Sequence, residues 1–151
     1  PAKIVFLNAA GQMWADEPLL INKWFTVQAT AMSFPGEAPV VDRIRTLMQF
    51  DIFSEKNPNN VYSLVMAFMT NNEAEFHRTD GSGYDFWVEM VLRLDKVNPH
   101  VAARCARALD NWRRYTPERA QLMHAALKKV AETPEISKAV REIVAKALNN
   151  N

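Results

Sequence analysis

The chain has 151 residues, the length of one ordinary domain, and its 48% hydrophobic and 23% charged residues are typical of a packed globular protein. Eighteen basic and seventeen acidic side chains give a formal charge of +1, which argues against nucleic acid or an anionic membrane as a partner. The single cysteine, Cys105, excludes an internal disulfide, and no apolar run approaches the roughly 20 residues of a membrane helix. We therefore expect a folded cytoplasmic protein.

The first third of the sequence predicts two helices. Polar and apolar residues alternate weakly from Lys3 to Leu7, so a strand is possible there. Apolar residues at helical spacing then predict a helix from about residue 20 to 31 and a second from about 41 to 48. Because the sequence opens without an initiator Met, we expect it to be a fragment of a longer polypeptide.

Pairs of a capping residue and a proline then predict four further helix starts. They are Asn57-Pro58, Asn98-Pro99, Thr116-Pro117 and Thr133-Pro134. In each pair the side-chain oxygen of the first residue can accept a hydrogen bond from a backbone N–H of the first helical turn. Proline is tolerated at the next position because the N–H that it lacks would have no partner in the helix. Glu118 and Glu135 follow in the first turns of the last two predicted helices, where the helix dipole favours negative charge.

Apolar residues between these starts recur at i, i+3, i+4 and i+7, as on the buried face of a helix. The stripes are Val61, Leu64, Val65, Phe68 and Met69; Phe86, Trp87, Met90, Val91 and Leu94; Val101, Cys105, Ala108, Leu109 and Trp112; Ala120, Met123, Leu127 and Val130; and Ile136, Val140, Ile143, Val144 and Ala147. Together with the first two helices, the sequence predicts seven.

These patterns predict an all-α fold as one domain over residues 1–151. The last three starts are spaced so that helices of about 15 residues follow one another with almost no loop, which makes neighbours antiparallel. Stacked antiparallel helix pairs are the architecture of an α-solenoid, a superhelix of the armadillo or HEAT type. No repeated sequence signature is present to prove repeats.

Common catalytic signatures are absent from the sequence. It contains no HExxH, GxSxG, GxxxxGK or GxGxxG motif. The histidines His77, His100 and His124 stand at separations unsuited to one metal site. We therefore expect this segment to bind no metal and to have no catalytic residue of its own.

The segment FHRTDGSGY at residues 76–84 lies between two predicted helices and allows two interpretations. In the structural one, Asp80 or Ser82 caps a helix, the glycines permit positive φ, and Ser82 pairs with Asp85 as in a capping box. In the functional one, His77, Asp80 and Tyr84 face a partner or ligand, as polar loop residues on a rigid scaffold often do.

A row of polar residues is predicted opposite the apolar stripe of the helix after Pro99. It comprises Arg104, Arg107, Asn111 and Arg114. Such a row is usually solvated, but a guanidinium can also hold a carboxylate through two parallel hydrogen bonds. Cys105 lies on the apolar stripe itself, and we interpret it as a core residue.

Several short motifs occur in a characteristic order. They are Lys23-Trp24-Phe25 with Gln28-Ala29-Thr30, Asn57-Pro58-Asn59, Phe76-His77 with Asp80-Gly81-Ser82-Gly83-Tyr84, and Asn98-Pro99. In combination they resemble the C-terminal helical domain of bacterial aminopeptidase N, an alanyl aminopeptidase of the zinc gluzincin class. The resemblance runs from about Leu19 to Leu148.

The resemblance implies a larger, multidomain exopeptidase that removes N-terminal residues from peptides. Its zinc motif and its substrate motif would lie in an upstream catalytic domain, so that zinc is a cofactor of the parent and not of this segment. This segment would pack against the catalytic domain of the same polypeptide, cap the active-site chamber and limit substrate access. The peptide substrates would be its only other partners.

The resemblance also implies candidate residues that face the chamber. Arg104 matches a family arginine that resembles a contact for the distal part of the substrate. Asn60 and Tyr62 stand where relatives carry basic residues, so a second basic contact is absent here, and Tyr62 could line the chamber through its ring and hydroxyl. The alternative from another class of protein is a free-standing helical-repeat adaptor that binds a peptide or protein in its groove.

Overall fold

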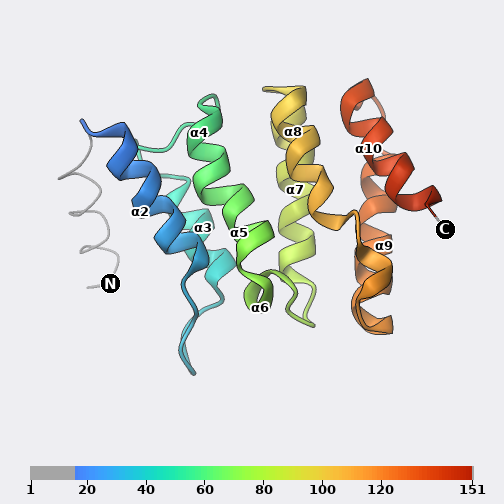
Figure 1. Cartoon of the computed structure of the whole chain (residues 1–151), viewed down its shortest axis with the longest axis horizontal. Coiled ribbons are helices and arrows are strands. Elements are labelled where there is room, and N and C mark those ends of the chain that lie inside the picture. The colour runs from blue at the N-terminus through green and yellow to red at the C-terminus, as the bar shows by residue number, and fades with distance from the viewer. Residues whose placement is uncertain (1–15, 151) are drawn as a thin grey trace. The chain divides into compact units, whose positions relative to one another are not determined.

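A computed structural model describes residues 16–150, and all regular structure in that range is helical (Figure 1). In chain order the elements are α2 (Pro18–Thr30), α3 (Val40–Leu47), α4 (Pro58–Val61), the π-helical η1 (Tyr62–Met66), α5 (Ala67–Asn71), α6 (Glu73–Phe76), α7 (Ser82–Asp95), α8 (Pro99–Ala106), the 3₁₀ segments η2 (Arg107–Leu109) and η3 (Trp112–Arg114), α9 (Pro117–Ala131) and α10 (Lys138–Asn149). The all-α class is confirmed, and the possible strand at Lys3 to Leu7 lies outside the described residues. Within residues 16–150, none of the helices has both the length and the apolar character needed to cross a membrane.

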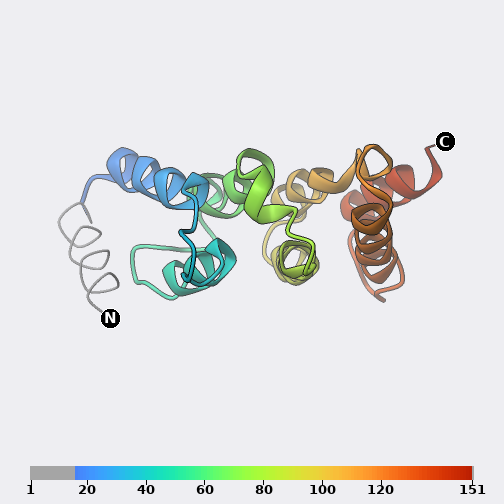
Figure 2. The ribbon, with the colours of Figure 1, turned by 90° about the horizontal axis from the view of Figure 1, so that it is seen from below.

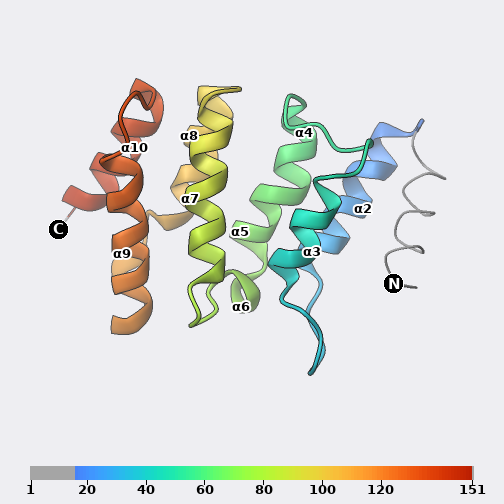
Figure 3. The same ribbon diagram turned by 180° about the vertical axis from the view of Figure 1, so that it is seen from behind.

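The chain divides into two compact units, one that ends at Asn72 and one that begins at Glu73. In the first unit, α2 lies in one layer with the continuous helix formed by α4, η1 and α5, and α3 lies in the other layer (Figure 2). In the second unit, α8 and α10 form one layer, and α7 and α9 form the other. Each unit is therefore built from stacked helices, as the predicted α-solenoid class requires (Figure 3).

The first unit is held together by the apolar face of α2 and by the end of α5. Phe25 is completely buried, and its ring meets the edge of Phe53 with the ring centroids 5.7 Å apart. At the end of α2, the buried amide of Asn72 donates hydrogen bonds to the carbonyl oxygens of Ala29 at 2.9 Å and Ala31 at 3.0 Å. These bonds satisfy carbonyls that a helix end leaves unpaired.

A π turn interrupts the helix that begins at Pro58. Asn57 caps this helix as predicted, since its side chain accepts a hydrogen bond from the backbone N–H of Asn59 at 3.0 Å. Within the π turn the carbonyl oxygen of Ser63 lies 3.1 Å from the hydroxyl of Thr26 on α2. A neighbouring helix thus supplies a donor to a backbone group of the π turn.

The second unit has a core built by the predicted stripe of α7. Trp87 is completely buried, and its indole N–H donates to the carbonyl oxygen of Cys105 on α8 at 3.1 Å. Cys105 is itself fully buried, which confirms it as a core residue, and burial raises the pKa of its thiol to about 12. The thiol is therefore protonated and unreactive at neutral pH.

The helix after Pro99 is shorter than predicted. Asn98 caps it through hydrogen bonds from the backbone N–H groups of His100 and Val101, but α8 ends at Ala106 and the chain continues as η2 and η3. The tighter backbone brings Trp112 to α10, where its indole N–H donates to the carbonyl oxygen of Ala147 at 3.0 Å. Tertiary contact with the end of α10 therefore replaces the predicted continuous helix.

The predicted helix start at Thr133-Pro134 is wrong. The last helix begins at Lys138, and Ser137 caps it by accepting a hydrogen bond from the backbone N–H of Val140. The backbone N–H of Ser137 donates in turn to the carboxylate of Asp95 at 2.7 Å, which fixes the start of α10 against the end of α7. Glu135 is not in a first helical turn but in the connecting segment, with a positive φ of 64°.

Candidate functional site

The sequence motif at residues 76–84 forms a compact aromatic cluster in the second unit. The imidazole Nδ1 of His77 lies 2.7 Å from the hydroxyl of Tyr84, and both side chains are buried. Tyr115 stacks on the imidazole with the ring centroids 4.2 Å apart and an interplanar angle of 22°. Phe76 meets both His77 and Tyr84 edge to face. The cluster joins the end of α6, the start of α7 and the segment before α9.

Hydrogen bonds of Arg119 and Tyr115 tie this cluster to α9 and to α6. The guanidinium Nε of Arg119 donates to the carbonyl oxygen of His77 at 2.7 Å, and its Nη1 lies 3.3 Å from the hydroxyl of Thr116. The hydroxyl of Tyr115 donates to the carboxylate of Glu73 at 3.4 Å. These hydrogen bonds join the cluster to other groups of the same unit.

Burial keeps the two central groups of the cluster neutral. The pKa of His77 is lowered chiefly by burial, with the charge of Arg119 lowering it further and the charge of Glu73 opposing both. Burial raises the pKa of Tyr84 to about 12. At neutral pH the pair is therefore an uncharged imidazole and an uncharged phenol that share one hydrogen bond, which is an arrangement suited to holding a turn.

The rest of the motif shapes the turn into α7. Asp80 accepts hydrogen bonds from the backbone N–H of Ser82 at 2.9 Å and from its hydroxyl at 2.6 Å, and these bonds lower the pKa of the Asp80 carboxyl. Gly81 has a φ of +79°, as the structural interpretation predicted for a glycine here. The predicted capping box is wrong, because Ser82 is the first residue of α7 and its hydroxyl donates to Asp80 instead of capping.

The functional interpretation of this loop stays a prediction. The structure brings two of its three residues, His77 and Tyr84, into direct contact and buries them. Asp80, the third, is exposed and lies 3.2 Å from the guanidinium Nε of Arg78. Of the three, Asp80 is therefore the one that presents a charged group at the surface.

Arg104 lies exposed on α8, a helix that buries Val101, Ala102, Cys105 and Ala106. The predicted row of polar residues does not lie along one helix, because α8 ends at Ala106. Its other members are also exposed: Arg107 in η2, Asn111 in the turn that follows and Arg114 in η3. A contact between Arg104 and a carboxylate stays a prediction.

Asn60 and Tyr62 lie in the helix that starts at Pro58, in the first unit. Asn60 is buried, and its amide donates to the side-chain oxygen of Asn22 at 2.9 Å and accepts from the backbone N–H of Ser54 at 3.0 Å. It therefore fixes the segment before Pro58 to α2. Tyr62 is half-buried and is the first residue of the π turn.

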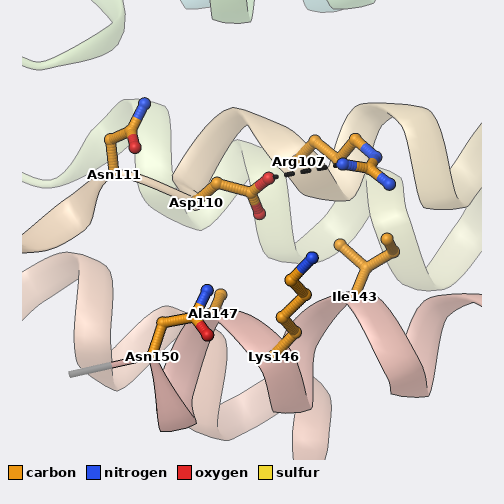
Figure 4. A pocket seen from close by; sticks show the side chains of 7 residues that line it. All are labelled: Arg107, Asp110, Asn111, Ile143, Lys146, Ala147 and Asn150. Carbon is orange, nitrogen blue, oxygen red and sulfur yellow. Dashed lines mark ion pairs between the residues drawn. The ribbon is translucent and has the colours of Figure 1, made fainter.

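A polar pocket that the sequence did not predict lies in the second unit, between α10 and the segment after α8. Its volume is about 210 Å³. As Figure 4 shows, its lining residues are Arg107, Asp110, Asn111, Ile143, Lys146, Ala147 and Asn150. Arg107 and Asp110 form an ion pair at 3.8 Å, and burial raises the pKa of Asp110 against the opposing charges of Arg107 and Lys146. The chain turn after Ala106 brings these residues together. No sequence motif therefore marks them.

In residues 16–150, no three His, Cys, Asp or Glu side chains are placed so that they could hold a metal ion. The described polar side chains make hydrogen bonds that hold turns and helix starts in place.

Comparison with known proteins identifies the family. The family model described as "Domain of unknown function (DUF3458_C) ARM repeats" matches residues 2–149. The chain belongs to this family. It is 40% identical over 145 residues to aminopeptidase N of Caulobacter vibrioides, and 36% identical over 148 residues to aminopeptidase N of Escherichia coli. These alignments cover 94% and 98% of the chain, and the predicted resemblance to the C-terminal domain of aminopeptidase N is confirmed.

A solved structure is similar in fold to this DUF3458_C chain. The crystal structure of Legionella pneumophila aminopeptidase A in complex with aspartic acid matches with a TM-score of 0.84 and 32% sequence identity. The match covers 95% of this chain and 16% of that one. The chain likewise spans only 16% and 17% of the two aminopeptidase N relatives. The similarity therefore concerns one domain of much longer polypeptides.

Proposed function

We propose that this chain is the C-terminal, non-catalytic domain of a zinc-dependent aminopeptidase that removes N-terminal amino acids from peptides. The observation that carries the proposal is the family match over residues 2–149, with aminopeptidase N relatives aligned along almost the whole chain. In the parent polypeptide the domain caps the active-site chamber and limits the access of substrates. Its partners are the catalytic domain of the same polypeptide and the peptide substrates.

The proposal assigns the chemistry to the part of the parent outside this chain. Two observations support that assignment: the sequence has no HExxH motif, and the residues from 16 to 150 include no trio of metal-ligating side chains. Zinc bound in the parent would polarise the scissile carbonyl and its attacking water. We also assign the parent to the cytoplasm, a reducing compartment that suits a chain with one buried thiol.

Arg104 and Tyr62 are the residues that we assign to the chamber. Arg104 is exposed on α8, and a guanidinium can hold the carboxylate of a peptide through two parallel hydrogen bonds. Tyr62 offers a ring and a hydroxyl at the start of the π turn. Asn60 contributes indirectly, since its hydrogen bonds to Asn22 and Ser54 hold the helix that carries Tyr62.

The capping role is tested by substrate size. The parent and a form that lacks this chain are compared for hydrolysis of a short peptide and of a folded protein with an accessible N-terminus. We expect the deletion to lower cleavage of both substrates, and the ratio of folded-protein to short-peptide cleavage in the residual activity to rise at least tenfold, because the chamber is then open. An unchanged ratio would contradict the capping role.

A substitution in the intact parent tests the chamber assignment without removing the domain. Tyr62→Arg places a basic residue where the resemblance implies one in relatives, and we expect a changed preference for peptide length. Arg114→Ala, which alters an exposed arginine of η3 that we do not assign to the chamber, serves as the control. A Tyr62→Arg profile identical to that of the unchanged parent would remove Tyr62 from the chamber.

A further inference from the structure

The polar pocket of the second unit takes no part in the proposed function. Four of its lining residues come from the end of α10 and recur at i, i+3, i+4 and i+7, so that they lie on one face: Ile143, Lys146, Ala147 and Asn150. Lys146 reaches from this face toward the opposite wall, as Figure 4 shows. The end of α10 therefore supplies the pocket with one positive charge and two apolar side chains.

The opposite wall carries charges of both signs. Arg107 begins the 3₁₀ segment η2 and Asp110 follows it, three residues later, a spacing at which side chains of such a helix project on the same side. Their ion pair is 3.8 Å long, which exceeds the length of a hydrogen bond, and the two side chains are 60% and 38% exposed. Both charged groups therefore remain able to bind a ligand.

The polar side chains of the pocket have unused hydrogen-bonding capacity. Within residues 16–150, hydrogen bonds to other residues are made by none of the side chains of Arg107, Asp110, Asn111, Lys146 and Asn150. The polar side chains of the segment 76–84, in contrast, are bonded to one another. The pocket thus gathers donors and acceptors that the fold itself does not use.

The charges of the pocket select a small molecule that carries both signs. An anion alone would be repelled by the carboxylate of Asp110, and a cation alone by Arg107 and Lys146. A zwitterion can place its carboxylate at the two cations and its ammonium group at Asp110. The volume of about 210 Å³ lies below the range of about 300–1,000 Å³ that is usual for sites of drug-sized ligands, which favours a ligand smaller than a peptide.

We propose that this pocket binds a free amino acid with an apolar side chain. Arg107 and Lys146 hold its α-carboxylate, Asp110 holds its α-ammonium group, and Ile143 and Ala147 contact its side chain. The amino acid is a free one, because a residue within a peptide lacks at least one of these two charges on its own α-carbon. The site itself does not depend on the proposed function. Only the source of the ligand does, since an aminopeptidase releases free amino acids.

Titration of the 151-residue chain with L-leucine tests the site. This chain is used because the active site of the parent would also bind amino acids. Binding is followed through the NMR shifts of backbone amides that line the pocket. Two analogues are titrated in parallel: isocaproate, which lacks the ammonium group, and isoamylamine, which lacks the carboxylate.

We expect saturable shifts with L-leucine and at least tenfold weaker binding of both analogues. The absence of saturable shifts up to the solubility limit of L-leucine would overturn the proposal. Equal affinity for L-leucine and isocaproate would also overturn it, as would tighter binding of inorganic phosphate than of L-leucine, because either result would indicate a site for simple anions.

Two substitutions test the roles of the charged residues. Lys146→Ala should weaken L-leucine binding at least tenfold, whereas Lys129→Ala, which removes the same charge from an exposed position of α9, should change it by less than twofold. Asp110→Asn should lower the preference for L-leucine over isocaproate to less than threefold, because the ammonium group loses its partner. Equal losses in the two lysine variants, or an unchanged preference in Asp110→Asn, would contradict the assignment.

Hydrolysis of a short peptide by the parent is measured separately from binding. Saturable binding of L-leucine together with an inactive parent would refute the proposed function and leave the amino-acid site intact. An active parent together with a chain that does not bind L-leucine would refute the site and leave the proposed function intact.

Discussion

Neighbouring glycines in the segment 76–84 are needed for different physical reasons. Gly81 has a φ of +79°, a backbone conformation that side chains with a Cβ rarely adopt, and a Cβ there would make only ordinary contact with Leu122 at 3.7 Å. Gly83 lies in α7, but a Cβ at this position would stand 1.9 Å from the carbonyl oxygen of Phe76. The short distance results from the close approach of α7 to the end of α6.

Gly83→Ala should therefore destabilise the second unit more than Gly81→Ala. We expect Gly83→Ala to lower the free energy of unfolding by about 3 kcal/mol or more, because backbone must shift to admit the methyl group. Gly81→Ala should cost about 1–2 kcal/mol from left-handed backbone strain. Chemical denaturation of both variants measures the difference, and a smaller loss for Gly83→Ala would contradict the close approach.

His77 should make the stability of the chain depend on pH. Its pKa is lowered in the folded state, chiefly by burial, so the unfolded chain binds a proton more readily. The stabilisation is fully present above the unfolded pKa of about 6.5 and is lost as the pH falls from there toward the lower folded pKa. Chemical denaturation at pH 8 and pH 5 should show this loss in the unchanged chain.

The variant His77→Gln should lose less stability between pH 8 and pH 5, since it removes the titrating group. His100→Gln is the matched control, because it changes an exposed histidine in the first turn of α8 and should retain the pH dependence of the unchanged chain. If His77→Gln and His100→Gln behave alike, His77 is not the source of the dependence.

At the scale of the helices, a pair of predicted caps provides a comparison. Asn98 accepts hydrogen bonds from two backbone N–H groups at the start of α8. Thr116 precedes α9 as predicted, but its side chain accepts no backbone hydrogen bond and instead lies 3.3 Å from the guanidinium of Arg119. Only the first residue therefore acts as a helix cap.

Asn98→Ala should cost about 1 kcal/mol of stability, the usual effect of removing a capping side chain. Thr116→Ala should cost less than half of that, because no backbone group loses its partner. Thermal unfolding followed by circular dichroism compares the two variants. Equal losses would show that Thr116 stabilises α9 in a way that the hydrogen bonds do not explain.

Helix positions were largely predictable from sequence, because burial imposes its own spacing on the apolar residues. The stripe of α7 predicted that Phe86, Trp87 and Leu94 would be buried, and all three are completely buried. The break after Ala106 was not predictable, since the apolar spacing continues through Leu109 and Trp112. That break depends on the contact between Trp112 and the end of α10, which is remote in sequence.

The start of the last helix was predicted wrongly for a related reason. A capping threonine followed by proline is a sound local signal, but Ser137 is held by Asp95 on another helix, and that contact fixes where α10 begins. The short helix α6 was also not predicted, because four residues are too few to show a periodic stripe. Local sequence signals thus predicted where most helices lie, but they missed the helix boundaries that depend on tertiary contacts.

At the scale of the whole molecule, the candidate residues divide into two kinds. His77, Tyr84 and Asn60 are buried and engaged in hydrogen bonds that hold turns in place, which explains their presence in the motifs by packing. Arg104 and Asp80 are exposed and Tyr62 is half-buried, and a contact of these three with another molecule stays a prediction. Sequence alone could not separate the two kinds, because some of the groups that contact the buried ones, such as Tyr115 on His77 and Asn22 on Asn60, lie far away along the chain.

The central claim is that this chain is a structural and gating part of an aminopeptidase and performs no catalysis itself. Hydrolysis of a chromogenic alanyl anilide tests it most directly, with zinc added to the isolated chain, to the full parent and to a parent that lacks this chain. We expect the isolated chain to be inactive, the parent to be active and the deletion to cripple the parent. Cleavage by the isolated chain, or full activity of the parent on this substrate after the deletion, would contradict the account.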